Sequence, residues 1–249
     1  QNKNEIAAIV FEPTVYEKPL PEFLSKIRKI ADSNNSILIL DEIVTGFRFA
    51  LGGGQEYFDL KGDFVCFGKG MGNGLPISAI SGTEEFMKIF DTLWVSTTNG
   101  SETLSLAGTL ATINEIKNKQ TISHCWEVGK KLFDGWNQIA KEHEINALMT
   151  GYPIRMTMNC KDSKNNHSLS LKGLILQEMV KQGIFMAQGP TFISYSHKIE
   201  EIQKTLSAWE NVCKFIQKSI KSDNYSDFME GKLPQSVYTH KILPTKKIS

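Results

Sequence analysis

The chain has 249 residues, of which 41% are hydrophobic and 22% are charged, the balance of an ordinary soluble protein with a sizeable core. Its 28 basic and 27 acidic residues give a formal net charge of +1, so the protein as a whole attracts neither nucleic acid nor an anionic membrane. No stretch approaches the roughly 20 apolar residues of a membrane helix. We therefore expect no nucleic-acid partner and no membrane partner.

Cysteine and histidine usage indicates no metal site. The four cysteines lie far apart and form no C-x-x-C pair, and the five histidines are scattered, so neither a zinc site nor a disulfide framework is expected. We interpret the cysteines as buried free thiols in a reducing compartment and expect a cytoplasmic protein. They are Cys66, Cys125, Cys160 and Cys213.

The chain opens on an apolar run at residues 6–11, which predicts a strand buried on both faces. Pro13 ends that strand, because proline cannot donate to a strand ladder. Proteins seldom begin on a central strand, so we expect the sequence to lack an N-terminal part of a longer protein. The alternative is a natural N-terminus with an early strand.

A βαβ unit follows from the next two elements. Apolar residues recur at helical spacing over residues 23–31, and residues 37–40 form a second buried strand. Two apolar strands joined by an amphipathic helix predict a parallel sheet. Such sheets bind ligands at the carboxyl ends of their strands, where Asp41 and Glu42 stand.

The remaining patterns change in character along the chain. Strands are predicted at residues 64–67 and 77–80, a short helix at 84–90, and long helices from about 102 and at about 123–143. Strands at 153–160, 184–186 and 192–195 and helices at 171–182 and 200–220 then indicate an α+β layer. We place a domain boundary near residues 120–145. The polar tail from about residue 222 either wraps a neighbour or is loosely ordered.

Lys69 lies in a loop with glycines at positions 68, 70, 72 and 74. Glycine lets the backbone approach a ligand closely, so a lysine in this loop is positioned rather than solvated on a helix face. An unprotonated lysine amine can form a Schiff base with an aldehyde. Pyridoxal-phosphate enzymes need such a lysine and an acid that keeps the pyridine nitrogen protonated, and Asp41 is the candidate acid.

Other phosphate sites fit less well. Residues 68–74 match neither G-x-G-x-x-G nor the Walker A pattern. The run ILILDE at residues 37–42 resembles a Walker B strand, and an ATPase in which Asp41 holds magnesium therefore stays open as an alternative, although it leaves the Lys69 loop without a role. An inactive fragment is a further alternative.

The segment STTNG at residues 96–100 stands just before a predicted helix. Hydroxyls and backbone amides at a helix N-terminus favour an anion, and they can also cap the helix near Glu102. The segment is therefore a candidate phosphate site, a helix cap, or both.

Three motifs in one order resemble the class III aminotransferases of the pyridoxal-phosphate fold type I. They are DEIVTGFR at 41–48, GKG at 68–70 and STTNG at 96–100, and GGQEY at 53–57 is most similar to the branch around glutamate-1-semialdehyde 2,1-aminomutase. The resemblance covers nearly the whole chain. It implies an α/β fold, with residues 1–125 as the C-terminal portion of the large cofactor-binding domain and residues 126–249 as the small α+β domain and tail.

The resemblance also implies a role for each matching residue. Lys69 matches the catalytic lysine that holds pyridoxal 5'-phosphate as a Schiff base and then moves the substrate proton. Asp41 matches the acid on the ring nitrogen, and Ile43 the residue that packs on the ring face. Thr97, with Thr98 as the fallback, matches the threonine that reaches the cofactor phosphate of the neighbouring subunit. A homodimer with sites at the interface is thus expected. Glu12 matches the acid of a Glu-Pro pair.

The resemblance implies that the activity is amino-group transfer between a small amino donor and a carbonyl acceptor. The alternative is the intramolecular aminomutase reaction. Family members are longer than this chain, and the N-terminal part that they add carries a Gly-Ser/Thr phosphate loop. Ser101-Glu102 replaces an Asn-Pro pair of the family, which favours the aminotransferase-like members over the true aminomutase.

Overall fold

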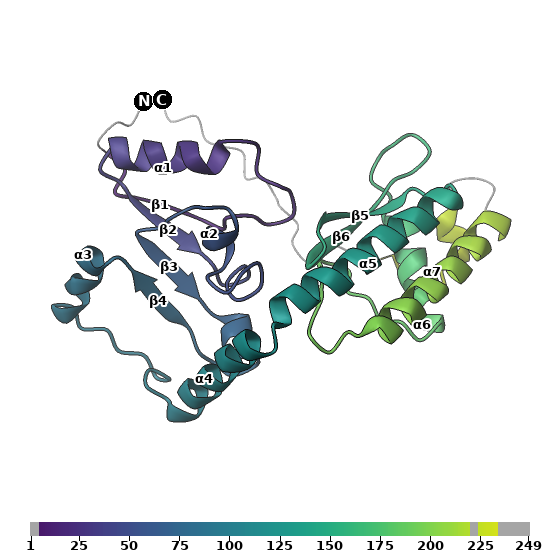
Figure 1. The fold of residues 1–249 in the computed structure, drawn as a ribbon. Helices are drawn as coiled ribbons and strands as arrows, with labels where there is room; N and C mark the ends of the chain where they lie inside the picture. Colours follow the sequence, from purple (N-terminus) through teal and green to yellow (C-terminus); the bar gives the residue numbers. More distant parts are fainter. Residues whose placement is uncertain (1–4, 220–223, 234–249) are drawn as a thin grey trace. The chain divides into compact units, whose positions relative to one another are not determined.

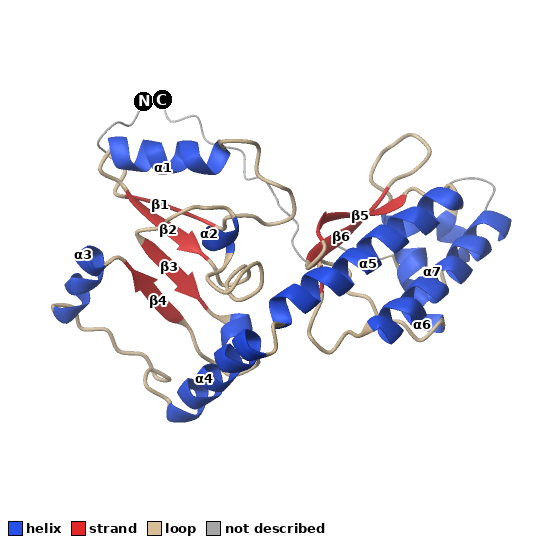
Figure 2. Cartoon of the chain, in the orientation of Figure 1, coloured by secondary structure: helices blue, strands red, loops and turns tan. Residues whose placement is uncertain are grey.

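The computed structural model describes residues 5–219 and 224–233, which form two compact units. Of the described residues, one unit comprises 5–134, 150–157 and 190–203, and the other comprises 135–149, 158–189, 204–219 and 224–233. Helices, strands and loops are distinguished in Figure 2. No helix within the described ranges is long and apolar enough to cross a membrane.

The first unit contains a four-stranded sheet in the order β1-β2-β3-β4 (Figure 1). Its strands are β1 (Ala8–Phe11), β2 (Ile37–Asp41), β3 (Phe64–Phe67) and β4 (Ala79–Gly82). The first three strands are parallel and β4 is antiparallel to β3. The predicted βαβ unit is therefore confirmed, and the carboxyl ends of β2 and β3 lie at one edge of the sheet.

Helix α1 (Phe23–Ser33) joins β1 to β2 and packs on one face of the sheet. Leu24 and Ala31 of the helix are buried against Leu38 and Leu40 of β2 and Val65 of β3. Burial of each of the larger side chains contributes roughly 1.5–3 kcal/mol, so this cluster stabilises the packing of α1 on the sheet.

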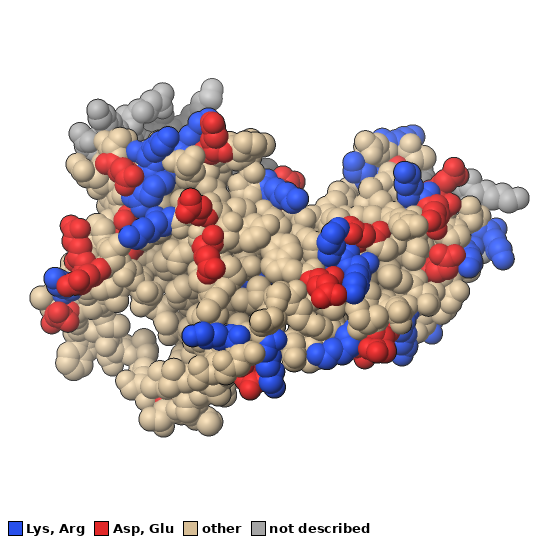
Figure 3. Space-filling model, viewed as in Figure 1, with Lys and Arg blue, Asp and Glu red and all other residues tan. Residues whose placement is uncertain are grey.

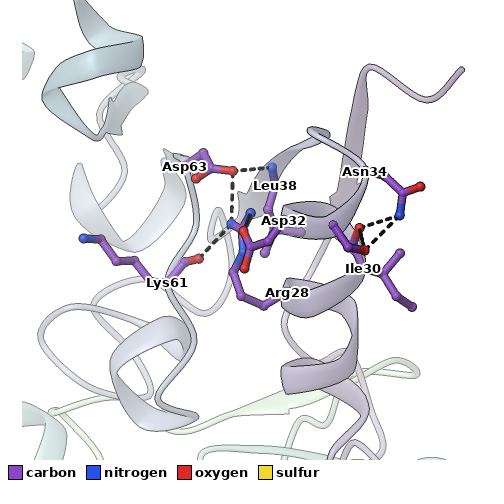
Figure 4. A network of polar contacts seen from close by, with 8 residues as sticks. Arg28, Ile30, Asp32, Asn34, Leu38, Lys61 and Asp63 are labelled. Carbon is purple, nitrogen blue, oxygen red and sulfur yellow. Dashed lines mark hydrogen bonds and ion pairs between the residues drawn. The ribbon is translucent and has the colours of Figure 1, made fainter. Parts of the chain in front are cut away.

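A polar network joins α1 to the sheet (Figure 4). The Arg28 guanidinium contacts Asp63 at 3.0 Å and Asp32 at 2.6 Å, and it donates to the carbonyl of Lys61 at 3.3 Å. The same Asp63 oxygen accepts the backbone N–H of Leu38 at 2.7 Å. The network therefore joins the start of β2 to α1, the helix that precedes it.

Two further helices of this unit follow the sheet. The short helix α2 (Gly54–Tyr57) lies between β2 and β3. Three short helices lie between β3 and α4: η1 (Lys69–Met71), α3 (Glu84–Met87) and η2 (Lys88–Asp91). Helix α4 (Thr103–Asn118) begins after Glu102, and helix α5 (Thr121–Glu142) begins in the first unit and ends in the second. These helices match the expected ones within a few residues.

The second unit is built around two stacked indoles. Trp136 and Trp209 are fully buried with ring centroids 4.0 Å apart, and their N–H groups donate to the carbonyls of Ala147 and Trp136. The indoles come from α5 and α7 (Ile199–Ser219), and α6 (Leu169–Lys181) supplies further buried residues. Helix η3 (Tyr225–Phe228) completes the described part.

A three-stranded sheet of the order β5-β6-β7 has residues in both units. Its strands are β5 (Ala147–Tyr152), β6 (Arg155–Cys160) and β7 (Thr191–Phe192), and β7 is antiparallel to β6. Strand β5 was not predicted, because glycine and threonine interrupt its apolar pattern.

Three expectations are wrong. Strand β1 is an edge strand with Val10 62% exposed, so it is not buried on both faces. Residues 184–186 form no strand, and they follow a helix end with Gly183 at φ +79°. The strand predicted at residues 192–195 is β7, which ends at Phe192, and residues 193–195 form no strand. The predicted tail falls largely on residues 220–223 and 234–249, outside the described residues.

Candidate active site

Asp41 and Lys69 follow neighbouring parallel strands at the same edge of the sheet. Asp41 is the last residue of β2 and pairs in register with Cys66 of β3, and Lys69 comes three residues after Cys66. Burial, and secondly the Asp41 carboxylate, raise the pKa of the Cys66 thiol, which places that carboxylate close to β3. The two predicted site residues therefore start from adjacent strand ends.

The half-buried Asp41 carboxylate is only partly satisfied. Its Oδ1 accepts the backbone N–H of Ile43 at 3.1 Å, and no other hydrogen bond or ion pair to it is formed within the described residues. One carboxylate oxygen thus remains free to accept a hydrogen bond from a cationic N–H group.

Lys69 is held by its backbone and left free at its amine. Its carbonyl accepts the N–H groups of Gly72 and Asn73 at 3.1 Å each, and its φ is +43°. That conformation costs a residue other than glycine about 1–2 kcal/mol and is concentrated at functional sites. The side chain is exposed, and no described residue forms a hydrogen bond or ion pair with its amine.

Space and an apolar wall lie beside this lysine. A Cβ added at Gly70 meets nothing within 4 Å, whereas one at Gly68 meets the side chain of Ile43 at 3.8 Å. The Ile43 side chain therefore lies close to Gly68, the residue before Lys69.

Glu42, for which the sequence analysis assigned no role, organises the loop after β2. It is fully buried, and its carboxylate accepts the N–H groups of Gly54 at 2.7 Å and Gln55 at 2.6 Å and the hydroxyl of Thr45. A Cβ at Gly53, whose φ is +86°, would lie 2.6 Å from this carboxylate. An acid followed by a glycine cluster was the available signal, but only the fold shows that the two meet.

Thr97 and Thr98 lie in the exposed segment before α4. Neither hydroxyl is bonded to another described residue, and no contact among the described residues joins them to Asp41 or Lys69. The helix is capped by Glu102 instead, whose carboxylate accepts the N–H groups of Leu104 and Ser105 at 2.7 Å. The threonines are thus not required for capping.

Glu12 has a structural partner. Its carboxylate contacts the Arg155 guanidinium at 3.1 Å, and the same nitrogen donates to the carbonyl of Thr14 at 3.0 Å. This ion pair joins the end of β1 to β6 within the first unit. Within the described residues no group of three or more His, Cys, Asp or Glu side chains could hold a metal ion.

Comparisons with known proteins show the family and the fold of the chain. The model of the class III aminotransferases matches residues 1–209. A glutamate-1-semialdehyde 2,1-aminomutase of Alkaliphilus oremlandii (strain OhILAs) is 34% identical over 224 residues, which cover 84% of this chain and 53% of that protein. The chain spans about half the length of the curated relatives it matches.

Solved structures show the same fold. A transaminase with pyridoxal phosphate bound superposes with a TM-score of 0.79 at 18% identity, over 87% of this chain and 54% of the other. An omega-transaminase from Sphaerobacter thermophilus superposes with a TM-score of 0.77 at 19% identity, over 86% of this chain and 53% of the other.

The chain has the fold of these transaminases, which confirms the expected α/β class. The chain belongs to the class III aminotransferases, a family that uses pyridoxal 5'-phosphate. The family match over residues 1–209 leaves the Walker B interpretation of residues 37–42 without support.

Proposed function

We propose that the protein to which these residues belong transfers an amino group between a small amino donor and a carbonyl acceptor, with pyridoxal 5'-phosphate held at Lys69. One observation carries the proposal: a carboxylate with one unbonded oxygen and an unbonded amine follow adjacent parallel strands at one sheet edge. When bound, the cofactor supplies an electron-withdrawing ring that stabilises negative charge on the substrate carbon.

The residues present fit that cofactor. The free oxygen of Asp41 would accept a hydrogen bond from the protonated ring nitrogen, a bond to a charged group worth about 1.5–3 kcal/mol. Ile43 would pack on the ring face, and the open space at Gly70 leaves room beside it. The Lys69 amine would hold the cofactor covalently and, once displaced by the substrate amine, would take and return the proton at the substrate carbon.

The proposal extends to a homodimer. Thr97, with Thr98 as the alternative, would donate to the cofactor phosphate of the partner subunit, and their unbonded hydroxyls are available for it. Leu93, Trp94 and Val95 just before them are 52%, 93% and 67% exposed, and apolar surface of this kind favours burial in an interface.

Two broader assignments belong to the same proposal. Residues 1–125 would be the C-terminal portion of the cofactor-binding domain, and residues 126–249 the small domain and tail. A cytoplasmic location is supported by the four cysteines, which are all free thiols.

The aminomutase reaction is the second candidate, because relatives of that name are 30–34% identical to the chain. Intermolecular transfer releases a keto acid from the donor, whereas the mutase converts glutamate 1-semialdehyde without an external acceptor. Assays with and without an added carbonyl acceptor therefore separate the two.

Spectroscopy on Lys69 variants tests the cofactor site. We expect the purified protein with added cofactor to absorb in the visible, and borohydride to fix the cofactor on the peptide that contains Lys69. Lys69→Ala abolishes the adduct completely, and the exposed Lys61→Ala serves as the control that retains it. Asp41→Asn keeps the adduct but loses turnover. An adduct on another lysine, or normal turnover in Asp41→Asn, contradicts the assignment.

A further inference from the structure

A cavity of about 460 Å³ lies beside the Lys69 loop, within the first unit. Gly70 and Asn73 form one wall, α4 and the start of α5 form a second, and residues 193–196 after β7 form a third. Neither Lys69 nor Asp41 lines it. The volume suits a small organic molecule, since ligand pockets commonly span about 300–1,000 Å³.

Arg48 is the cation of this cavity. Its guanidinium donates one hydrogen bond, to the Ile193 carbonyl at 3.0 Å, and lies 4.8 Å from the centre of the Phe192 ring. No carboxylate among the described residues pairs with it, and the remaining donors are not sealed from solvent. A guanidinium has five N–H donors in a planar fork, so most of its donor capacity is available to a ligand.

The electrostatic surroundings leave this charge uncompensated. Burial is the largest cause that lowers the pKa of Arg48, and the neighbouring Arg155 adds to it. Cys125 lines the cavity as a neutral thiol, because burial raises its pKa. Glu115 is the acidic residue of the lining, and Lys119 neutralises it at 2.5 Å. An anion in the cavity would therefore meet a net positive field.

The rest of the lining is mainly apolar. Phe47, Ala111, Ile122 and the Tyr195 ring contribute to its walls. Asn73, exposed and with φ +48°, adds an amide whose donors are not used by another described residue. The combination of a forked cation, an amide and apolar walls matches a carboxylate that carries a short hydrocarbon chain.

We infer that the Arg48 cavity binds small apolar monocarboxylates, with the guanidinium on the carboxylate and the hydrocarbon chain against Phe47 and Ile122. The site is separate from the cofactor site of the proposed function, and it requires neither cofactor nor turnover. Because Gly70 and Asn73 form its wall, its occupancy contacts the loop that carries Lys69.

Calorimetric titration of the cofactor-free chain with hexanoate tests the inference, and uncharged hexanamide serves as the matched ligand. Hexanoate binds at one site and hexanamide binds at least about tenfold more weakly, because a charge-assisted bidentate contact is lost. Arg48→Gln weakens hexanoate by a similar factor. Equal binding of the two ligands, or no binding of hexanoate, overturns the inference.

Arg48 also supports Ile193, so a variant on another wall is needed in case Arg48→Gln does not fold. Ala111→Phe fills the cavity from the exposed side of α4 without touching Arg48, and it abolishes hexanoate binding. Lys69→Ala binds hexanoate as the wild type does. Retained binding in Ala111→Phe, or loss in Lys69→Ala, shows that hexanoate binds elsewhere and overturns the assignment, whatever the outcome for the cofactor.

Discussion

The loop after β2 and the segment before α4 satisfy their polar groups in opposite ways. Glu42 accepts the N–H groups of Gly54 and Gln55 inside the first unit, so internal bonds determine that loop. In the segment before α4, Trp94 is 93% exposed and the hydroxyl of Thr97 has no bonded partner among the described residues. Charged groups of both signs cover α1 in Figure 3, whereas the surface over α4 is mostly uncharged.

We therefore expect the loop after β2 to affect the stability of the fold and the segment before α4 to affect association with a partner. Changes in the Glu42 loop should lower the free energy of unfolding, because they leave buried polar groups without a hydrogen-bond partner. Changes in the segment before α4 should leave folding nearly unaffected and alter what the chain binds.

Glu42→Ala should give the largest loss of stability. The substitution leaves the N–H groups of buried Gly54 and half-buried Gln55 and the buried Thr45 hydroxyl without an acceptor. We expect a cost of about 3 kcal/mol or more. Urea unfolding measures it. Thr98→Val in the exposed segment is the control and should change stability by less than about 0.5 kcal/mol. Equal effects of the two would remove the contrast between the regions.

Gly53→Ala should come next. Its φ of +86° and the approach of Glu42 to 2.6 Å from an added Cβ together predict a loss of about 1–3 kcal/mol. Gly70→Ala is the matched substitution, because nothing lies within 4 Å of its Cβ, and it should cost less than about 1 kcal/mol. A Gly70→Ala variant less stable than Gly53→Ala would contradict the description of the two loops.

Trp94→Ser tests the exposed segment before α4. We expect a change in unfolding free energy within about 0.5 kcal/mol, since the indole is exposed, and a weaker self-association by sedimentation velocity. Leu20→Ser, at an equally apolar position that is 76% exposed outside this segment, should leave association unchanged. If both variants associate like the wild type, the segment is not part of an interface.

The smallest effect concerns His143 in the second unit. Hydrogen bonding to Gln217 and then to Glu210 raises the pKa of His143. The stabilisation is thus fully present below the unfolded pKa of about 6.5 and is lost as the pH rises through the folded pKa. We expect a few tenths of a kcal/mol at this surface pair. Urea unfolding at about pH 5.5 and 8 should show it, and His143→Gln should lack it.

Elements with a regular spacing of apolar residues were predictable, because that spacing matches the period of a helix or a strand. Helix α1, the parallel pair β1–β2 and the long helices follow from apolar spacing alone. Strand β5 was missed because glycine and threonine interrupt its apolar pattern. Residues 184–186 were misassigned because a short apolar run does not distinguish a strand from a loop without a partner strand. The edge position of β1 depends on the sheet order, which local sequence does not encode.

The amino-acid sequence by itself determined the order of the three motifs and hence the family, together with the candidates Asp41 and Lys69. Only the tertiary structure decided that these residues follow adjacent strands, that Glu42 binds the loop twelve residues further along, and that Arg48 lines a cavity without an acidic partner. The physical reason is that chemistry-bearing residue types are visible in a sequence, whereas hydrogen-bond partners and desolvation are properties of which segments meet in space.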